Sequence, residues 1–310
     1  MSNILIIKHG SLGDLIQANG AIKDIKNFYP NRKVLLLTTQ PYSIFMSECP
    51  YLDGVLIDKR LPRWNLFYLN NLKKTLSNYD FSKVFDLQNS SRTKFYKRFI
   101  INNAEWSSTE TTLEPGQRKR DFDKDPVLDR MEIQLKKSGI ETEFTKNIDL
   151  SWAVENTSHL VKKYTNREYI LLFPFCSPKL KNKKWPYYKE LIQKLKQEFK
   201  NKYSVLLAPG PNEIEEANKL NAKVVLENNE HVTLKTLVSL IHSAKLVIAN
   251  DTGPAHIASH LDKKGLVLFG SHTSAKKVSI ENFNFKALSV KNLNDLDVNT
   301  VLNEVKAKLD

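Results

Sequence analysis

The chain has 310 residues, of which 41% are hydrophobic, so it is long enough for two domains with packed cores. No apolar run approaches the ~18 residues of a membrane span, and the two cysteines, Cys49 and Cys176, lack the spacing of a zinc site or a disulfide framework. The net charge of +13 predicts an anionic partner, which could be a nucleic acid, an acidic lipid surface or a phosphorylated small molecule, unless the excess lysines only form a solvated surface.

Short β-branched and Leu-rich runs alternate with amphipathic segments from the start of the chain, as in parallel sheets with crossover helices. In the first half, this pattern predicts strands at 4–7, 34–39, 55–57 and 83–87, and helices at 14–28, 65–77, 90–100 and 127–137. The polar segment 103–125 interrupts the pattern, and we predict a long functional or mobile loop there.

The second half repeats the pattern after a polar stretch at 147–158, where we place the domain boundary. It predicts strands at 169–175, 204–208, 224–226, 246–249 and 265–269, helices at 187–199, 213–220, 234–242 and 256–261, and a closing helix at about 297–309. The expected fold is therefore α/β, with two Rossmann-like doubly wound domains, 1–152 and 153–310. Ligands of open α/β sheets bind at the carboxyl ends of the strands, so we expect the reaction in a cleft between the domains.

The turn after the first strand reads Lys8-His9-Gly10-Ser11-Leu12-Gly13-Asp14. Its glycines and serine allow another molecule to approach the backbone, and the amides of a helix N-terminus attract anions. It is neither a dinucleotide fingerprint nor a Walker loop. Asp14 could simply be the helix N-cap, or it could act as a general base at the edge of the sheet.

Two further segments of the second half follow predicted strands. The first is Asn250-Asp251-Thr252-Gly253-Pro254-Ala255-His256, whose helix N-terminus would suit a diphosphate, although it could be no more than a well-capped helix. The second is the lysine-rich loop 176–186, where an ammonium could stabilise a departing phosphate. Taken alone, that loop is better explained as a solvated basic surface.

Together these segments resemble the family 9 glycosyltransferases, the heptosyltransferases of lipopolysaccharide core assembly. The stretches Asp86-Leu87-Gln88, Lys183-Lys184-Trp185-Pro186, and Ala208-Pro209-Gly210 with Glu213 extend the resemblance over most of the chain. It implies a GT-B fold with the acceptor in the N-terminal domain and an ADP-sugar in the C-terminal domain. No metal or cofactor is implied beyond the nucleotide-sugar co-substrate, ADP-heptose.

The resemblance also implies roles for single residues. Asp14 would deprotonate the acceptor hydroxyl, which attacks the anomeric carbon with inversion, and Lys183 would stabilise the leaving diphosphate. Donor contacts are expected from Ser177, Lys184, Asp251, Thr252, Gly253 and His256. Acceptor contacts are expected from Ser11, Gly13, Arg60, Arg63, Arg92 and Arg120, with Arg118 as an alternative to Arg120, because guanidinium groups bind the carboxylates of Kdo or the phosphates of lipid A bidentately.

Two departures from the family pattern concern specificity. His9 and Gly10 replace a pair of small residues, and the segment 269–275 replaces a Phe-Gly-x-Thr-x-Pro loop that borders the donor. An alternative is therefore transfer of another nucleotide-activated sugar to a different glycan or protein. A nucleotide-sugar epimerase has the same two-domain build but no support from the motifs, and a non-catalytic basic protein that binds RNA or an anionic membrane would have no reason to combine Asp14 with the segment 251–256. We expect a monomeric cytoplasmic enzyme without nucleic-acid partners, which uses an anionic glycolipid such as Kdo-lipid A and contacts the cytoplasmic face of the inner membrane.

Overall fold

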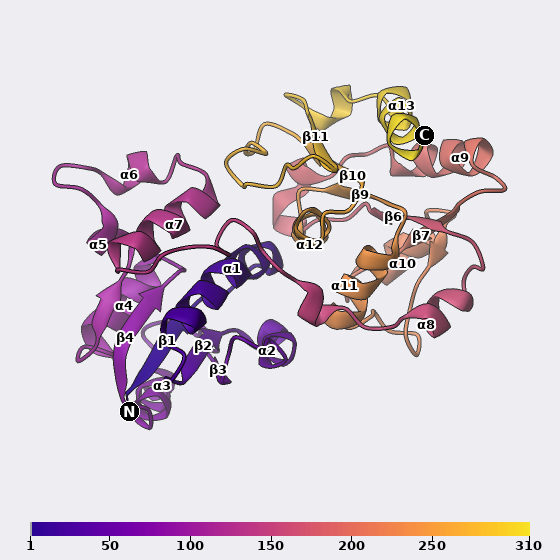
Figure 1. Ribbon diagram of the computed structural model, residues 1–310. Helices are drawn as coiled ribbons and strands as arrows, with labels where there is room; N and C mark the ends of the chain where they lie inside the picture. The colour runs from indigo at the N-terminus through magenta and orange to yellow at the C-terminus, as the bar shows by residue number, and fades with distance from the viewer. Residues whose placement is uncertain (1) are drawn as a thin grey trace. The chain divides into compact units, whose positions relative to one another are not determined.

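Two parallel β-sheets, each flanked by helices, make up the protein (Figure 1). The computed structural model describes residues 2–310, and the chain divides into two units, Met1–Trp152 and Ala153–Asp310. Every strand pair in both sheets is parallel. The predicted α/β class with two doubly wound sheets is therefore confirmed.

The first sheet has the strand order β3-β2-β1-β4-β5. The elements of this unit are β1 (Asn3–Ile7), α1 (Leu12–Phe28), β2 (Val34–Thr38), α2 (Gln40–Ser47), β3 (Gly54–Ile57), α3 (Leu66–Ser77), β4 (Phe81–Asp86), α4 (Ser91–Phe99), β5 (Glu105–Ser107), α5 (Thr109–Thr112), α6 (Lys119–Phe122) and α7 (Val127–Lys137). Chain order reverses between β1 and β4, where Ile7 pairs with Asp86. The turns that follow these two strands therefore meet at the switch point, the usual ligand site of such sheets.

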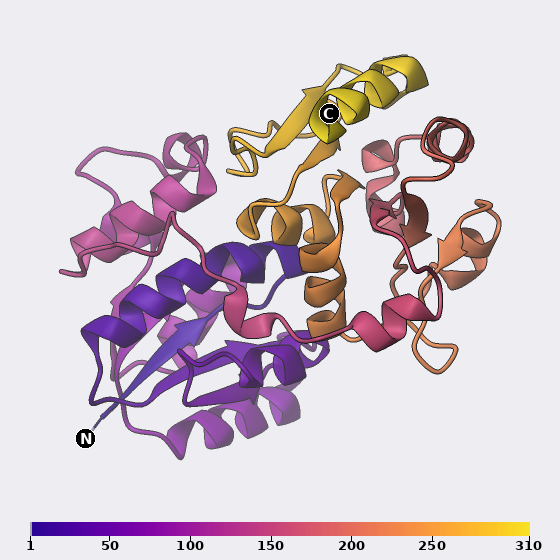
Figure 2. The same cartoon turned by 45° about the vertical axis from the view of Figure 1, so that its right-hand side comes forward.

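Helices cover both faces of this sheet. Leu5 and Ile7 of β1 pack into one apolar cluster with α3 and α4. Ile4 and Ile6 are equally buried and point to the opposite face, because successive strand residues alternate. On that face lie α1 and α7, which contact each other (Figure 2). Burial on both faces explains the continuous apolar sequence of β1.

The second sheet has the order β11-β10-β9-β6-β7-β8. The short helix η1 (Ser151–Ala153) spans the boundary between the units. The second unit contains α8 (Ser158–Lys162), β6 (Tyr169–Phe173), η2 (Pro178–Lys183), α9 (Tyr188–Glu198), β7 (Ser204–Leu207), α10 (Ile214–Asn218), β8 (Lys223–Val224), α11 (Leu234–Ser243), β9 (Leu246–Asn250), α12 (Gly253–His260), β10 (Gly265–Phe269), β11 (Phe285–Ser289), η3 (Leu293–Asp295) and α13 (Val298–Leu309). Chain order reverses between β6 and β9, where Phe173 pairs with Ala249. The loops after β6 and β9 are therefore adjacent.

The prediction of a long loop at 103–125 is wrong in part. Glu105–Ser107 forms β5, which pairs with β4, and two short helices follow. Trp106 is only 6% exposed, and its indole nitrogen donates to the carbonyl oxygen of Ile101 at 3.0 Å. This buried tryptophan fixes the segment as an edge of the sheet. Within residues 2–310, none of the helices has the length and apolar content needed to cross a bilayer.

Candidate active site

The turn after β1 presents a carboxylate at the N-terminus of α1. Ser11 precedes the helix, and Oδ2 of Asp14 accepts hydrogen bonds from both the amide and the hydroxyl of Ser11, each at 2.9 Å. The alternative that Asp14 is the N-cap is therefore wrong, since it lies in the first helical turn, where its charge suits the helix dipole. Its side chain is 42% exposed, which leaves the carboxylate accessible to a substrate.

A buried lysine stands beside this carboxylate. Lys8 is 5% exposed, and its ammonium donates to the carbonyl oxygen of Leu87 at 3.0 Å and lies 3.6 Å from Oδ1 of Asp14. Burial lowers the pKa of Lys8, although the carboxylates of Asp14 and Asp86 oppose the shift. Lys8 thus joins the turns after β1 and β4 and holds a cation next to Asp14. Its place directly after an apolar strand is the only signal of this role in the sequence.

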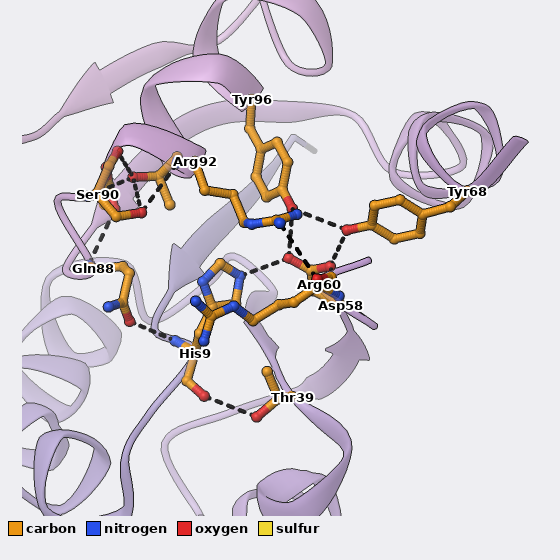
Figure 3. Close-up of polar contacts among 11 residues, drawn as sticks. His9, Thr39, Asp58, Arg60, Tyr68, Gln88, Ser90, Arg92 and Tyr96 are labelled. Atoms are coloured by element: carbon orange, nitrogen blue, oxygen red, sulfur yellow. Dashed lines mark hydrogen bonds and ion pairs between the residues drawn. The ribbon is translucent and has the colours of Figure 1, made fainter. Parts of the chain in front are cut away.

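The rest of this turn is fixed through its backbone. The amide of His9 donates to Oε1 of Gln88 at 2.9 Å, and its carbonyl oxygen accepts from the hydroxyl of Thr39 at 2.9 Å (Figure 3). Gly10 has a φ of +103°, and a Cβ at this position would lie 2.4 Å from the ring of Tyr42. Only glycine fits this conformation and this space. His9 and Gly10, which replace two small residues of the family pattern, therefore determine the conformation of this turn.

His9 and Asp58 form a buried pair at the centre of a polar network. Nε2 of His9 lies 2.9 Å from Oδ2 of Asp58, and both side chains are 0% exposed (Figure 3). Asp58 also accepts hydrogen bonds from the hydroxyls of Tyr68 and Tyr96, the latter at 2.7 Å, and from the amide of Arg60 at 2.8 Å. The carboxylate therefore ties the segment after β3 to the turn after β1.

Three of the predicted acceptor-binding arginines gather around this network. The guanidinium of Arg92 donates to the hydroxyl of Tyr96 at 3.1 Å and to the carbonyl oxygen of Arg60 at 3.3 Å. Arg63 donates to the carbonyl oxygen of Ser91 at 3.3 Å. Because α4 begins at Ser91, these contacts bring the segment after β3 and the start of α4 together. The result is a basic region on the same unit as Asp14.

Arg118 and Arg120 lie far along the chain from the other three arginines, at the start of α6. Their contacts are local, since Nε of Arg118 lies 3.0 Å and Nε of Arg120 lies 3.9 Å from the carboxylate of Asp121. Both arginine side chains are largely exposed. Gly13 is buried inside the first turn of α1, so its contribution to acceptor binding would be limited to its backbone.

The network around Asp58 should make the protein sensitive to acid. Burial alone would raise the pKa of Asp58, but hydrogen bonds from His9, Tyr68 and Tyr96 lower it from 3.8 to about 2. The ionised carboxylate therefore stabilises the fold above about pH 4 by about 2 kcal/mol, and this contribution is lost as the pH falls through about 2. We expect Asp58→Asn to lower the free energy of unfolding by about 2 kcal/mol at pH 7 and by roughly half as much at about pH 3. Urea unfolding at the two pH values measures this difference. A difference that does not depend on pH would contradict the assignment.

In the second unit, the loops after β6 and β9 are fastened together by Asn250. Its side-chain amide donates to the carbonyl oxygen of Pro174 at 2.9 Å, and its side-chain oxygen accepts from the amide of Trp185 at 3.2 Å. Trp185 is completely buried, and its indole nitrogen donates to the carbonyl oxygen of Leu296 at 2.8 Å. These contacts place the lysine-rich loop against the N-terminus of α12, which begins at Gly253 with Thr252 as its N-cap.

Asp251 is the centre of a charged cluster at this point. Its Oδ2 lies 2.6 Å from Nζ of Lys183 and 2.9 Å from Nε2 of His272, and its Oδ1 lies 3.7 Å from Nε2 of His256. The carboxylate is 3% exposed. Burial would raise the pKa of Asp251, but the interactions with His256 and Lys183 lower it well below its usual range. Asp251 therefore stays ionised and holds Lys183 and both imidazoles in place.

The two imidazoles leave polar atoms unsatisfied. Nδ1 of His256 and Nδ1 of His272 are buried, and neither has a hydrogen-bond partner among residues 2–310. Buried polar atoms of native proteins nearly always have a partner, which can be a ligand. The amide of Gly253 has no acceptor within the helix, whereas Pro254 has no N–H and the amide of Ala255 donates to the carbonyl oxygen of Thr252 at 3.0 Å. The positive end of the helix dipole attracts anions. The cluster therefore has the chemistry of an anion site.

His272 is a candidate that sequence reasoning missed. It follows β10, and its ring stacks on Phe269 with a centroid distance of 5.7 Å. The available signal was the position of segment 269–275, which replaces a donor-bordering loop of the family. This departure predicts a change of sugar specificity, but nothing local in the sequence indicates the contact of His272 with Asp251.

Two predicted donor-binding residues have other partners. The ammonium of Lys184 pairs with Glu216 of α10 and lies 5.7 Å from the ring centre of Phe175. Ser177 precedes η2, and its carbonyl oxygen accepts from the amide of Leu180. The geometry therefore joins Lys183, Asp251 and His256 directly, whereas Lys184 points to another carboxylate.

Comparisons with known proteins identify the family of the chain. The model of glycosyltransferase family 9 (heptosyltransferase) matches residues 69–292, which is more than half of the chain. This range contains Lys183 and Asp251 but begins after Asp14. A candidate glycosyltransferase of Haemophilus influenzae is 26% identical over 282 residues, covering 84% of this chain and 80% of that protein.

Solved structures share the fold. The Escherichia coli heptosyltransferase WaaC with ADP has a TM-score of 0.74 at 19% identity, with 99% of each chain covered. A family 9 glycosyltransferase of Veillonella parvula has a TM-score of 0.76 at 14% identity, covering 99% of this chain and 97% of that one. The UDP-GlcNAc 2-epimerase of Methanocaldococcus jannaschii has a TM-score of 0.61 at 16% identity, covering 100% and 93%. The predicted GT-B type of fold is thereby confirmed.

Proposed function

This chain belongs to glycosyltransferase family 9, and from that premise we propose that it transfers a heptose from ADP-heptose to a Kdo or heptose residue of a lipopolysaccharide core, with inversion at the anomeric carbon. The observation that carries the proposal is the cluster around Asp251. It combines a lysine, two buried imidazole nitrogens that have no hydrogen-bond partner within residues 2–310, and the N-terminus of α12, which suits the diphosphate of a nucleotide sugar. Solved structures of a similar enzyme, the E. coli heptosyltransferase WaaC, contain ADP and ADP-2-deoxy-2-fluoro heptose.

In this proposal, the second unit holds the donor. Thr252 and Gly253 donate backbone hydrogen bonds to phosphate oxygens, Asp251 orients the loop, and His256 lies against the phosphates. Lys183 stabilises the negative charge that develops on the diphosphate as the bond from the anomeric carbon to its oxygen breaks. These groups provide the charge stabilisation that a metal ion supplies elsewhere, so the proposed reaction uses neither metal nor cofactor. Ser177 and Lys184 would contribute at the edge of the donor site.

The first unit holds the acceptor. A sugar hydroxyl is a weak nucleophile, so Asp14 accepts its proton while the oxygen forms the new bond to the anomeric carbon. Ser11 and Gly13 shape the turn that carries this base. Arg60, Arg63 and Arg92 bind carboxylates or phosphates of the acceptor, and Arg120 extends the basic surface. We further propose that the enzyme acts as a monomer on the cytoplasmic side of the inner membrane and uses no nucleic acid.

A second candidate is the transfer of another nucleotide-activated sugar. The observation that favours it is His272, which occupies the altered segment 269–275 and contacts Asp251 at 2.9 Å. A different side chain at this position changes the groups available to a donor sugar. The same catalytic groups would serve both reactions, and only the sugar and its acceptor would differ.

A donor screen distinguishes the two candidates. ADP and ADP-heptose should raise the melting temperature, because a ligand that binds only the folded state stabilises it by mass action, whereas RNA should not. Mass spectrometry with Kdo-lipid A as acceptor should then detect a product heavier by one heptose. A product formed only with another nucleotide sugar would favour the second candidate. No stabilisation by any nucleoside diphosphate would reject both.

A further inference from the structure

An exposed apolar surface lies between β3 and the first turn of α3. Trp64 is 81% exposed, Leu66 is 75% exposed and Phe67 is 78% exposed, and Leu61 nearby is also exposed. We call these four residues the Trp64 tip. Single exposed apolar residues are common, but four within seven positions of one segment are unusual for a surface that stays in water.

The structure of α3 explains why the tip is not part of the core. The helix buries Tyr68, Leu69, Leu72 and Leu76 against the sheet. Phe67 lies on the opposite, solvent-facing side, seven residues and two turns before Lys74. The side chain of Asn65 accepts a hydrogen bond from the Tyr68 amide at 2.9 Å and so fixes the start of the helix. The tip is therefore a firmly held feature of the fold.

Positive charge surrounds the tip. From residue 59 to residue 79 the sequence contains no Asp or Glu, whereas it contains five cationic side chains, all exposed: Lys59, Arg60, Arg63, Lys73 and Lys74. Helix α4 is a neighbour of the tip, because the guanidinium of Arg63 lies 5.8 Å from the ring centre of Phe95 in α4. This helix adds further cationic side chains. Apolar and aromatic side chains ringed by Lys and Arg fit an anionic lipid surface, where the rings enter the headgroup layer and the cations meet phosphates.

We propose that the Trp64 tip docks this enzyme onto an anionic phospholipid bilayer. Trp64, Leu66 and Phe67 insert at the boundary between headgroups and acyl chains, and the exposed ammonium groups of Lys59, Lys73 and Lys74 bind lipid phosphates. The role of docking in transfer rests on the proposed lipid-linked acceptor, but docking itself does not. The segment begins at Asp58, whose carboxylate contacts His9 of the turn that carries Asp14. A docked tip therefore holds the acceptor-binding unit at the membrane that would contain its acceptor.

Vesicle binding tests the proposal directly. We expect the protein to co-sediment with vesicles of phosphatidylglycerol and phosphatidylethanolamine, and much less with vesicles of phosphatidylcholine. The double variant Leu66→Ser, Phe67→Ser should lose roughly tenfold in partitioning, because it removes the inserted apolar groups. The matched control is Phe283→Ser, which removes a phenylalanine that is 97% exposed in the other unit and should bind as the unmodified protein does. Melting temperatures should be unchanged, since none of these side chains belongs to a core.

Fluorescence gives an independent measurement. Trp106 and Trp185 are buried and Trp152 is half-buried, so Trp64, at 81% exposure, is the tryptophan most open to a change of solvent. Its emission should shift to shorter wavelength when the anionic vesicles are added, and Trp64→Phe should remove the shift while keeping most of the binding. Equal binding by the Leu66/Phe67 variant and the control would overturn the proposal. So would a concentration-dependent dimer that this variant dissociates, because the surface would then be an interface between two copies.

The same variants separate docking from catalysis. Activity toward a detergent-dispersed acceptor should be unchanged in the Leu66/Phe67 variant, whereas activity toward acceptor embedded in vesicles should fall together with binding. Loss of vesicle binding with equal loss of activity on both substrates would contradict the docking role. Vesicle binding by a protein without heptosyl transfer would leave the docking surface intact and reject only the proposed function.

Discussion

Replacing Asp14 by asparagine should lower kcat by roughly 10²- to 10⁴-fold, the usual contribution of a general base. Asparagine retains an oxygen that can accept the hydrogen bonds from Ser11, so the turn should keep its geometry while it loses the proton acceptor. The affinity for ADP should stay nearly the same, because the proposed donor site lies on the other unit. Steady-state kinetics and thermal stabilisation by ADP measure the two effects separately.

A matched control exists on the same unit. Asp149 is 37% exposed and lies 3.4 Å from Nζ of Lys23, which resembles the exposure of Asp14 and its separation from Lys8. Asp149→Asn removes a comparable carboxylate and should leave turnover within about twofold, as expected for surface substitutions away from a site. If the Asp14 variant kept most of its turnover, Asp14 would not be the base. A parallel loss of ADP stabilisation would instead point to a disturbed fold.

The sequence predicts the central strands well because of how they are buried. β1, β2, β9 and β10 are covered on both faces, so each is a short run of apolar residues between polar turns. The long amphipathic helices were also identified, and α7 and α13 begin and end where the sequence indicates. At the other predicted elements the bounds differ by a few residues, as expected at frayed ends. The helices α2 and α8 were not predicted.

Edge elements escaped prediction for a physical reason. β5 has three residues, one of them exposed, and β11 is only partly buried, so neither shows a continuous apolar run. Edge strands are defined by pairing with a neighbour more than by their own sequence. The same limit applies to Asp24, which accepts hydrogen bonds from the amides of Phe144 and Thr145, about 120 residues further along the chain.

The candidate site was predicted where it depends on local sequence. Glycine turns and helix N-termini can be recognised from a few consecutive residues, which is why the segments 8–14 and 250–256 stood out. The pairs His9 with Asp58 and His272 with Asp251 join residues 49 and 21 positions apart. The first pair joins the ends of β1 and β3, which lie on either side of β2, and the second joins the ends of the adjacent strands β9 and β10. The partner of Lys184 depends likewise on where α10 packs. Such pairings follow from tertiary structure and have no local signal.

Replacing Lys183 by alanine should weaken both donor binding and turnover, with a loss in kcat of about 10²- to 10³-fold, as for removal of one group that stabilises transition-state charge. The change also leaves the buried carboxylate of Asp251 without the ammonium that lies 2.6 Å away, so the loop should hold the diphosphate less firmly. Kinetics with ADP-heptose and titration with ADP would show the two losses together, in contrast to the Asp14 variant.

Lys181 provides the control for this substitution. It lies in the same short helix, η2, is exposed, and Lys181→Ala removes the same charge from the same loop. If the proposed role of Lys183 is correct, the Lys181 variant should keep its ADP affinity and turnover within about twofold, since a solvated charge away from the diphosphate is screened by water and salt. Equal losses in the two variants would mean that the loop acts only through its net charge. The specific contact between Lys183 and Asp251 would then have no part in transfer.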